Sequence, residues 1–199
     1  MADPNINWVN AQGMPSRSYN CGFCGHLIAS ATGYAYRASN GTANAYIYVC
    51  PHCAQPTHFS HGKQLPGVRP GASVANLPKD IETAYNEARD CVAASAYTAA
   101  AMLCRKLLMH LAVGCGAAVG LNFKGYVEYM VGAGYVPPNG RTWVDHIRDK
   151  GNEVNHELSF ASQEDANDLI GFLEMLLKFN YEFPARMGSK QPAAVARAP

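Results

Sequence analysis

The sequence contains no run that approaches the ~20 consecutive apolar residues of a membrane-spanning helix, and we therefore expect no membrane partner. It also lacks a Walker loop, a dinucleotide-binding fingerprint and a serine-nucleophile elbow, which excludes the enzyme classes that depend on these motifs. Nothing at the N-terminus resembles a signal peptide. From these absences we expect a protein of the reducing cytoplasm.

A strong excess of either charge is also missing, since the formal net charge is +1. Residues 1–78 carry four basic side chains against one acidic side chain, whereas residues 79–183 carry nine basic and fourteen acidic side chains. Neither region has the basic excess that marks a nucleic-acid-binding protein on charge alone.

Four of the seven cysteines form two Cys-x-x-Cys motifs, Cys21-Gly-Phe-Cys24 and Cys50-Pro-His-Cys53. Each motif places two thiolates on one tight turn, and a short hairpin brings two such turns together as the tetrahedral ligands of a zinc ion. Disulfide bonds are the alternative, but they require an oxidising compartment. We predict a closed, structural Zn²⁺ site formed by Cys21, Cys24, Cys50 and Cys53.

The predicted zinc ribbon covers residues 18–62, with a hairpin turn at Asn40-Gly41 and a strand over residues 45–49. Four histidines near the motifs are expected on the surface or behind the ligands, because four sulfurs already complete the metal's shell. They are His26, His52, His58 and His61. The aromatic residues of the ribbon are expected to cover a small core, with stacking on nucleic-acid bases as the alternative.

A Gly/Pro-rich linker over residues 63–77 leads to a helical domain over residues 78–183, and an Ala/Pro/Arg-rich flexible tail follows over residues 184–199. Apolar spacing and a capping signature at Ser162-Gln-Glu-Asp165 predict the helices. The first predicted helix begins at residue 78 and the last at residue 163. Those between them cover residues 97–111, 123–132 and 143–150. Because the second helix is apolar around much of its circumference, we expect a homodimer.

The order of these signals resembles a bacterial domain-of-unknown-function family that often accompanies restriction and defence genes. The resemblance covers residues 18–183. Its features are the two cysteine motifs, Leu77-Pro78-Lys79-Asp80-Ile81, Tyr85-Asn86-Glu87-Ala88, Ala99-Ala100-Ala101 to Leu107, and Ile147-Arg148-Asp149-Lys150-Gly151-Asn152 leading to His156. The helical part of that family is similar to HEPN domains, which are small helical bundles of ribonucleases, toxins and defence effectors.

The resemblance implies a candidate active site, because HEPN ribonucleases place an Arg and a His a few residues apart. Arg148 and His156 are the candidates, with Asn152 on the same helix face as His156. His156 would exchange a proton with the ribose 2′-OH while Arg148 stabilises the phosphate charge. The seven intervening residues exceed the family's spacing. In the alternative, Arg148 pairs with Asp145 or Glu153 and Asn152 caps a turn.

We predict a mainly α protein, in which a five- or six-helix, HEPN-like bundle follows an N-terminal β zinc ribbon. The expected function is that of a non-catalytic cytoplasmic recognition module in bacterial defence or nucleic-acid processing, acting as a homodimer with a protein, RNA or DNA partner. A metal-independent endoribonuclease is the first alternative. A DNA- or RNA-binding ribbon that uses Arg17, Arg37 and Lys63 is the second.

Overall fold

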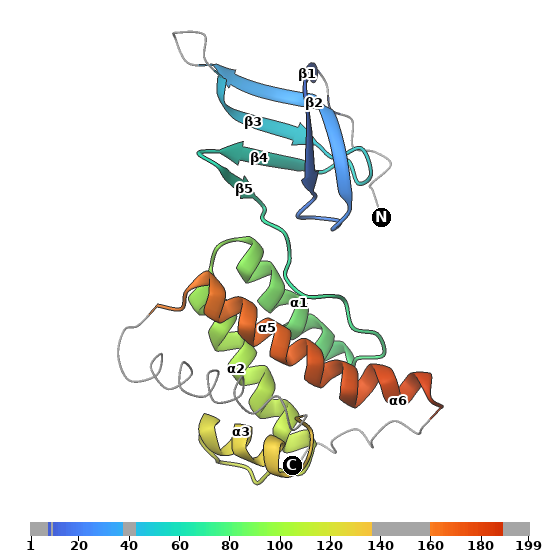
Figure 1. Ribbon diagram of the computed structural model, residues 1–199, viewed down its shortest axis with the longest axis vertical. Helices are drawn as coiled ribbons and strands as arrows, with labels where there is room; N and C mark the ends of the chain where they lie inside the picture. Colours follow the sequence, from blue (N-terminus) through green and yellow to red (C-terminus); the bar gives the residue numbers. More distant parts are fainter. Residues whose placement is uncertain (1–7, 9, 38–42, 137–159, 189–199) are drawn as a thin grey trace. The chain divides into compact units, whose positions relative to one another are not determined.

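The computed structural model describes residues 8, 10–37, 43–136 and 160–188. The chain divides into two compact units. The sheet unit consists of Met1–Arg69 with Ala93–Ser95, and the helical unit consists of Pro70–Val92 with Ala96–Pro199. Of the described strands and long helices, the strands all belong to the first unit and the helices to the second, apart from Ala93 at the end of the first helix (Figure 1).

In the described part of the sheet unit, five antiparallel strands follow the order β1-β2-β3-β4-β5. They are β1 (Gln12–Asn20), β2 (Leu27–Arg37), β3 (Ala43–Val49), β4 (Pro56–Ser60) and β5 (Lys63–Leu65). Each strand pairs with its neighbour in the sequence. The sheet is therefore a meander whose successive strands are joined by hairpins.

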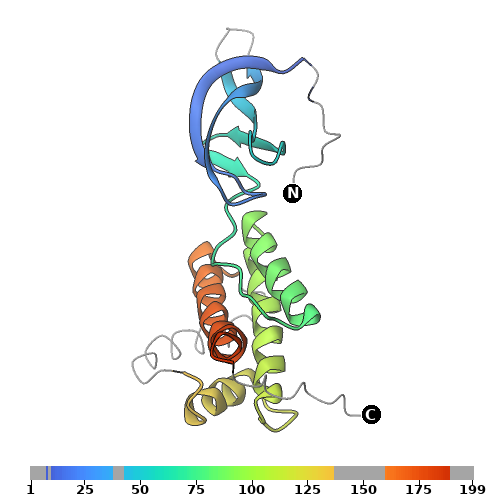
Figure 2. The same cartoon turned by 90° about the vertical axis from the view of Figure 1, so that its right-hand side faces the viewer.

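The sheet is strongly bent, so that β1 lies across the face of the later strands (Figures 1 and 2). The Tyr48 hydroxyl on β3 donates a hydrogen bond to the Pro15 carbonyl on β1 at 2.9 Å. The Gln64 amide on β5 donates to the carbonyl of Asn20, the last residue of β1, at 2.7 Å. These bonds hold β1 against strands that are not its neighbours in the sheet.

The bent sheet encloses a small core. Its buried members are Tyr19, Cys21, Tyr48, Cys50, Cys53 and Phe59. The Tyr19 and Phe59 rings meet edge to face with centroids 5.0 Å apart. The prediction that aromatic residues of the ribbon cover a small core is confirmed for Tyr48 and Phe59, whereas Tyr36 is 65% exposed.

The helical unit contains α1 (Lys79–Ala93), α2 (Tyr97–Gly114), α3 (Phe123–Gly132) and α5 (Gln163–Leu177). A π-helical turn, η2 (Lys178–Glu182), and a short helix, α6 (Phe183–Arg186), follow. Helix α2 packs against both α3 and α5. The four longer helices lie where the apolar spacing predicted them. Among the described helices, none combines the length and the apolar character that crossing a membrane requires.

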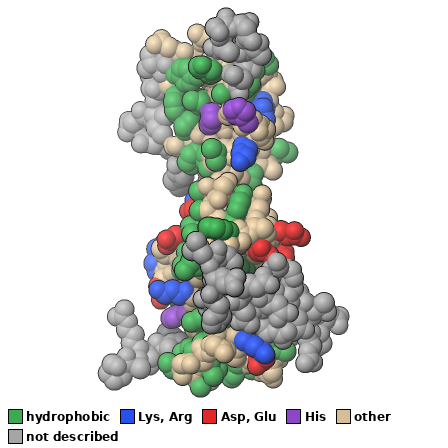
Figure 3. Space-filling view, turned by 90° about the vertical axis from the view of Figure 1, so that its left-hand side faces the viewer, with side chains coloured by type: hydrophobic (Ala, Val, Ile, Leu, Met, Phe, Trp, Pro, Cys, Tyr) green, Lys and Arg blue, Asp and Glu red, His purple; other side chains and the backbone are tan. Residues whose placement is uncertain are grey.

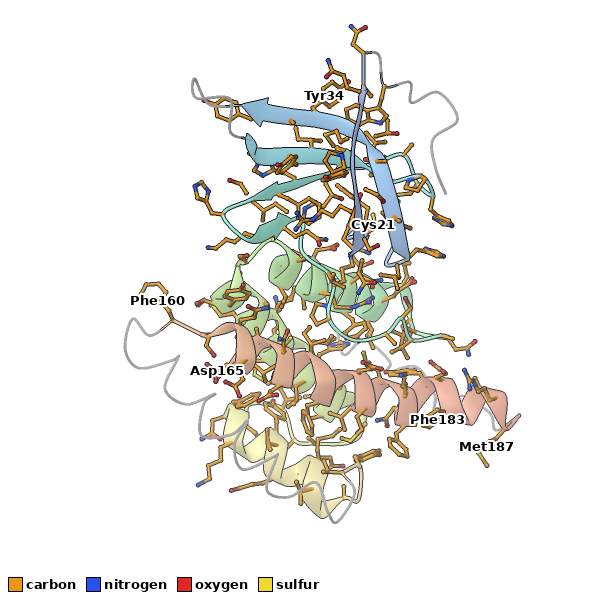
Figure 4. All side chains as sticks on the ribbon, turned by 45° about the horizontal axis from the view of Figure 1, so that its top comes forward. Cys21, Tyr34, Phe160, Asp165, Phe183 and Met187 are labelled. Atoms are coloured by element: carbon orange, nitrogen blue, oxygen red, sulfur yellow. The ribbon has the colours of Figure 1, made fainter. Side chains whose placement is uncertain are left out.

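Helix α5 begins with the capping box that the sequence predicted, close to the labelled Asp165 in Figure 4. The Ser162 hydroxyl oxygen accepts from the Asp165 backbone N–H at 3.1 Å. In return, the Asp165 carboxylate accepts from the Ser162 backbone N–H at 2.9 Å. Two backbone donors at the helix start are thereby satisfied.

The segment before α1, which the sequence predicted to be part of a linker, is fixed to the helices of its unit. Glu174 of α5 accepts a hydrogen bond from the Ala72 N–H at 2.9 Å, and Glu182 of η2 accepts from the Ala75 N–H at 3.0 Å. The Arg89 guanidinium on α1 donates to two backbone carbonyls of the same segment at 2.8 and 2.9 Å. The start of the helical unit is thus held by charge-assisted hydrogen bonds.

The predicted fold class is wrong. Instead of a mainly α, HEPN-like bundle of five or six helices, the described residues form a five-stranded antiparallel sheet and four longer helices, which is an α/β fold. Strand β1 was not predicted because most of its side chains are polar and exposed. Its pairing depends on backbone hydrogen bonds, which leave no apolar alternation in the sequence. The predicted helix over residues 143–150 lies outside the described residues.

Candidate metal centre

The four cysteines of the two motifs come together at one end of the sheet. Cys21 and Cys24 lie in the turn between β1 and β2, and Cys50 and Cys53 lie in the turn between β3 and β4. Because β2 and β3 pair in antiparallel fashion, the start of β2 and the end of β3 lie toward the same end of the sheet, with Tyr48 of β3 opposite Gly33 in the middle of β2. Figure 4 shows Cys21 at this end of β1. The sheet topology therefore brings the two predicted motifs side by side.

The two cysteine turns share one hydrogen-bond pattern. In each, the backbone N–H of the first cysteine donates to the carbonyl five residues later, and the N–H four residues later donates to the first cysteine's carbonyl. The N···O distances are 3.0 and 2.8 Å in the Cys21 turn and 3.0 and 2.9 Å in the Cys50 turn. The same backbone bonds therefore fix each turn from which a pair of cysteine side chains extends.

The sulfur positions fit a single tetrahedral ion. The Sγ atoms of Cys21 and Cys53 are 3.7 Å apart, those of Cys24 and Cys50 are 3.8 Å apart, and all four lie within 4.8 Å of one another. Four sulfurs at about 2.3 Å from one zinc ion would be about 3.8 Å from each other. A disulfide would require about 2.05 Å, and the four cysteines are free thiols. The geometry is that of a four-sulfur metal site.

Burial makes four ionised sulfurs costly unless a cation is present. Burial, together with the neighbouring thiols, raises the pKa of Cys53 to about 12. Burial also opposes ionisation of Cys21, but hydrogen bonds from the backbone N–H groups of Cys24 and Phe23 and from the Cys24 and Cys53 thiols together outweigh it and lower the pKa of that thiol. Thiols that bind a metal are deprotonated by it. A bound cation would therefore stabilise the fully ionised cluster.

Position 22, inside the first cysteine motif, has no room for a side chain, so it must be glycine. A Cβ atom at this position would lie 2.4 Å from the Pro66 carbonyl oxygen and 2.5 Å from that of Gly67. Both obstacles belong to the backbone, which cannot rotate away as a side chain can. Any larger residue would push the segment after β5 away from the first cysteine turn.

Two of the four nearby histidines form a pair beside the cluster. The exposed rings of His26 and His52 stack with centroids 3.8 Å apart and an interplanar angle of 27°. With Cys24 they form a second group whose ligand atoms lie within 4.8 Å of one another. His58 lies on β4 and His61 in the β4–β5 turn. Sequence patterns did not predict this pairing, although His52 lies within the second cysteine motif and His26 follows the first by two residues.

The residues predicted to bind nucleic acid do not share one environment. The Arg17 guanidinium carbon lies 3.9 Å from the centroid of the Phe59 ring, so this cation contacts the core aromatic. Lys63 is exposed on β5, and the side chain of Arg37 lies outside the described residues. Figure 3 shows basic and histidine side chains beside hydrophobic ones on one face of the sheet unit. Nucleic-acid binding by these residues stays a prediction.

The residues implied as a ribonuclease site, Arg148, Asn152 and His156, lie outside the described residues. Their spacing in the sequence exceeds the family's pattern, as noted above. The ribonuclease alternative therefore stays a prediction that an activity measurement must decide.

The residue after each cysteine motif has a left-handed backbone, with φ of 74° at Gly25 and 56° at Ala54. This conformation disfavours any residue that carries a Cβ atom, and we expect Ala54→Gly to raise the free energy of unfolding of the metal-bound sheet unit by about 0.5–1 kcal/mol. Gly25→Ala should lower it by a similar amount, since space around that position is open. Thermal unfolding of both variants measures the difference, and shifts of the same sign would contradict the argument.

Residues 86–193 match the family model described as a domain of unknown function, DUF4145. The match covers more than half of the chain and lies after the cysteine cluster. No match was found among curated proteins or among solved structures. The expected resemblance to a domain-of-unknown-function family is confirmed to this extent.

Proposed function

This chain belongs to the DUF4145 family, and we propose that it is a non-catalytic recognition module whose sheet unit is a zinc ribbon organised by one structural zinc ion. The observation that carries the proposal is the closed cluster of four cysteine sulfurs. A catalytic zinc keeps a position open for water or substrate, whereas four thiolates occupy every tetrahedral position. The metal would then stabilise a small fold and take no part in chemistry.

Zinc is the ion that this set of ligands favours. Four thiolates in a tetrahedral arrangement suit zinc or iron among the common metals of proteins. Zinc has no geometric preference of its own and no redox chemistry, so it serves as a structural ion. The separations of 3.7 and 3.8 Å between paired sulfurs agree with the length of about 3.8 Å that zinc requires.

A recognition role is supported by the side of the sheet opposite its core. Tyr34, Ile47, His58 and Leu65 follow one another across four paired strands. Nearby, Tyr36 is 65% exposed, and Leu65 itself is 44% exposed. Antiparallel sheets commonly carry polar residues on the side away from the core, and apolar surface there indicates an interaction site. We favour a protein partner over RNA or DNA, because the Arg17 cation already contacts Phe59.

The proposed setting is the bacterial cytoplasm, in defence or nucleic-acid processing. A reducing compartment keeps four thiols available for a metal. The expected homodimer is part of the proposal and is supported by Met102 on α2, which is 60% exposed on the helix expected to mediate self-association.

Purified full-length protein tests this function. We expect one zinc ion per chain by elemental analysis, and intact single-stranded RNA after incubation with the protein. A partner that co-purifies should be lost in Tyr36→Ala and retained in Val119→Ala, which truncates an even more exposed apolar side chain in the helical unit.

Two results would overturn the proposal. Iron in place of zinc would refute the structural-zinc assignment. Metal-independent cleavage of RNA that disappears in both Arg148→Ala and His156→Ala would establish the ribonuclease alternative instead.

A further inference from the structure

We propose that Cys24, His26 and His52 form a second metal site, which binds a divalent transition-metal ion beside the four-sulfur cluster. In this site the Cys24 sulfur bridges the two ions, and two imidazole nitrogens come from the two different cysteine turns. The inference rests on the proposed zinc ion at the first site, because the bridging sulfur must be a thiolate there.

The three ligand atoms are already within reach of one ion. They lie within 4.8 Å of one another, and the two imidazole rings are stacked with centroids 3.8 Å apart. Because the lone pair of an imidazole nitrogen lies in the ring plane, the stacked rings must turn about their side-chain bonds to face one ion. Both side chains are exposed and free to turn, and the turn brings the nitrogens to about 2.0–2.1 Å and the sulfur to about 2.3 Å from a zinc ion.

The orientation of His26 is the one that metal-binding histidines commonly have. Its Nδ1 atom lies 3.1 Å from the carbonyl oxygen of Cys24. A carbonyl oxygen only accepts hydrogen bonds, so Nδ1 carries the hydrogen and Nε2 of the neutral ring presents its lone pair. In known metal sites a hydrogen bond from the second ring nitrogen to a carbonyl fixes the tautomer and the ring plane in the same way.

Solvent exposure singles out Cys24 as the bridging ligand. Cys21, Cys50 and Cys53 are buried, whereas Cys24 is half-buried and His26 and His52 are exposed. Of the four sulfurs, that of Cys24 is therefore the one that an ion from solvent can approach.

Charge also favours a second cation at this place. Four thiolates around one zinc ion carry a formal charge of −2, since a thiolate contributes −1 and the ion +2. A second divalent ion neutralises this charge. Neutral imidazoles bind it without releasing a proton, and water completes its coordination. Two nitrogens and one sulfur suit zinc or copper among the first-row metals.

The test uses the full chain after loading with one zinc ion per chain. Calorimetric titration with Zn²⁺ should show a second equivalent that binds more weakly than the first. That equivalent should disappear in His26→Ala and in His52→Ala, while the first equivalent stays bound. His61→Asn is the matched control, because it removes an exposed imidazole of the same unit and Asn tolerates the φ of 48° at this position.

A spectroscopic titration with Co²⁺ tests the bridging sulfur. Cobalt binds four-sulfur sites more weakly than zinc does and should leave the first ion in place. The second site should then give a sulfur-to-cobalt charge-transfer band that both histidine variants lack.

The outcomes separate this inference from the proposed function. Absence of any second equivalent in the wild-type protein, or its persistence in both histidine variants, would overturn the second site. Loss of the first equivalent in either variant would show that a histidine is a ligand of the first ion, and it would also overturn the inference. Failure of the wild-type protein to hold even one zinc ion would instead refute the proposed function.

Discussion

Replacing Cys21 with Ser is expected to release the metal and unfold the sheet unit, while the helical unit keeps its far-UV circular dichroism signal. Apart from three cysteines, the buried core cluster of the sheet consists of Tyr19, Tyr48 and Phe59. Structural zinc contributes an apparent binding free energy of about 10–16 kcal/mol in small zinc domains. Three aromatic side chains at about 1.5–3 kcal/mol each do not replace that contribution.

Elemental analysis and hydrogen exchange of the strands measure this effect. Cys91→Ser is the matched control, because it removes a half-buried thiol of α1 outside the cluster. We expect the control to keep its metal and the protection of its strands. One metal ion per chain in Cys21→Ser would show that the four-sulfur site is wrong. Loss of the helical signal together with the strands would show that the two units unfold as one.

Gly33→Ala is expected to weaken metal binding about 100-fold, although residue 33 is not a ligand. Gly33 on β2 pairs with Tyr48 on β3, and a Cβ atom there would lie 1.9 Å from the carbonyl oxygen of Ile47. The two strands must then separate, and they are the strands that place the two cysteine turns side by side. A distortion of about 3 kcal/mol corresponds to about a 100-fold change in affinity, because metal binding and folding of the sheet are coupled.

Competition with a chromophoric chelator measures the affinity. Gly13→Ala is the control, since it adds the same methyl group to β1 where no atom lies within 4 Å. We expect its affinity to remain within a few-fold of the wild-type value. An affinity for Gly33→Ala equal to that of the control would show that contact between β2 and β3 does not determine the metal geometry.

The features that the sequence predicted correctly depend on neighbouring residues. Apolar residues at helical spacing predict helices α1, α2, α3 and α5, and the capping box at Ser162 identifies the start of α5. The four cysteines form two short motifs in the sequence. They come together in the structure because the two turns that carry them lie at one end of the sheet. Each of these features can therefore be predicted from residues that are close together in the sequence.

The features that the sequence did not predict depend on residues distant in the chain. Strand β1 is polar, and only its pairing with β2 and the bond from Tyr48 to Pro15 establish its place. The stacking of His26 on His52 joins two turns that lie on different hairpins. The predicted fold class was wrong for the same reason, because strands paired by backbone hydrogen bonds need no distinctive amino-acid composition.

The meander order of the strands has a consequence for the time at which the metal is acquired. Because every strand pairs with its neighbour in the sequence, the sheet forms by closing short loops, and folds rich in local contacts form quickly. The last strand ends at Leu65, whereas α1 begins at Lys79. Domains fold from the N-terminus during synthesis. On the ribosome, therefore, the nascent chain is expected to capture its metal before the residues of the helical core have emerged.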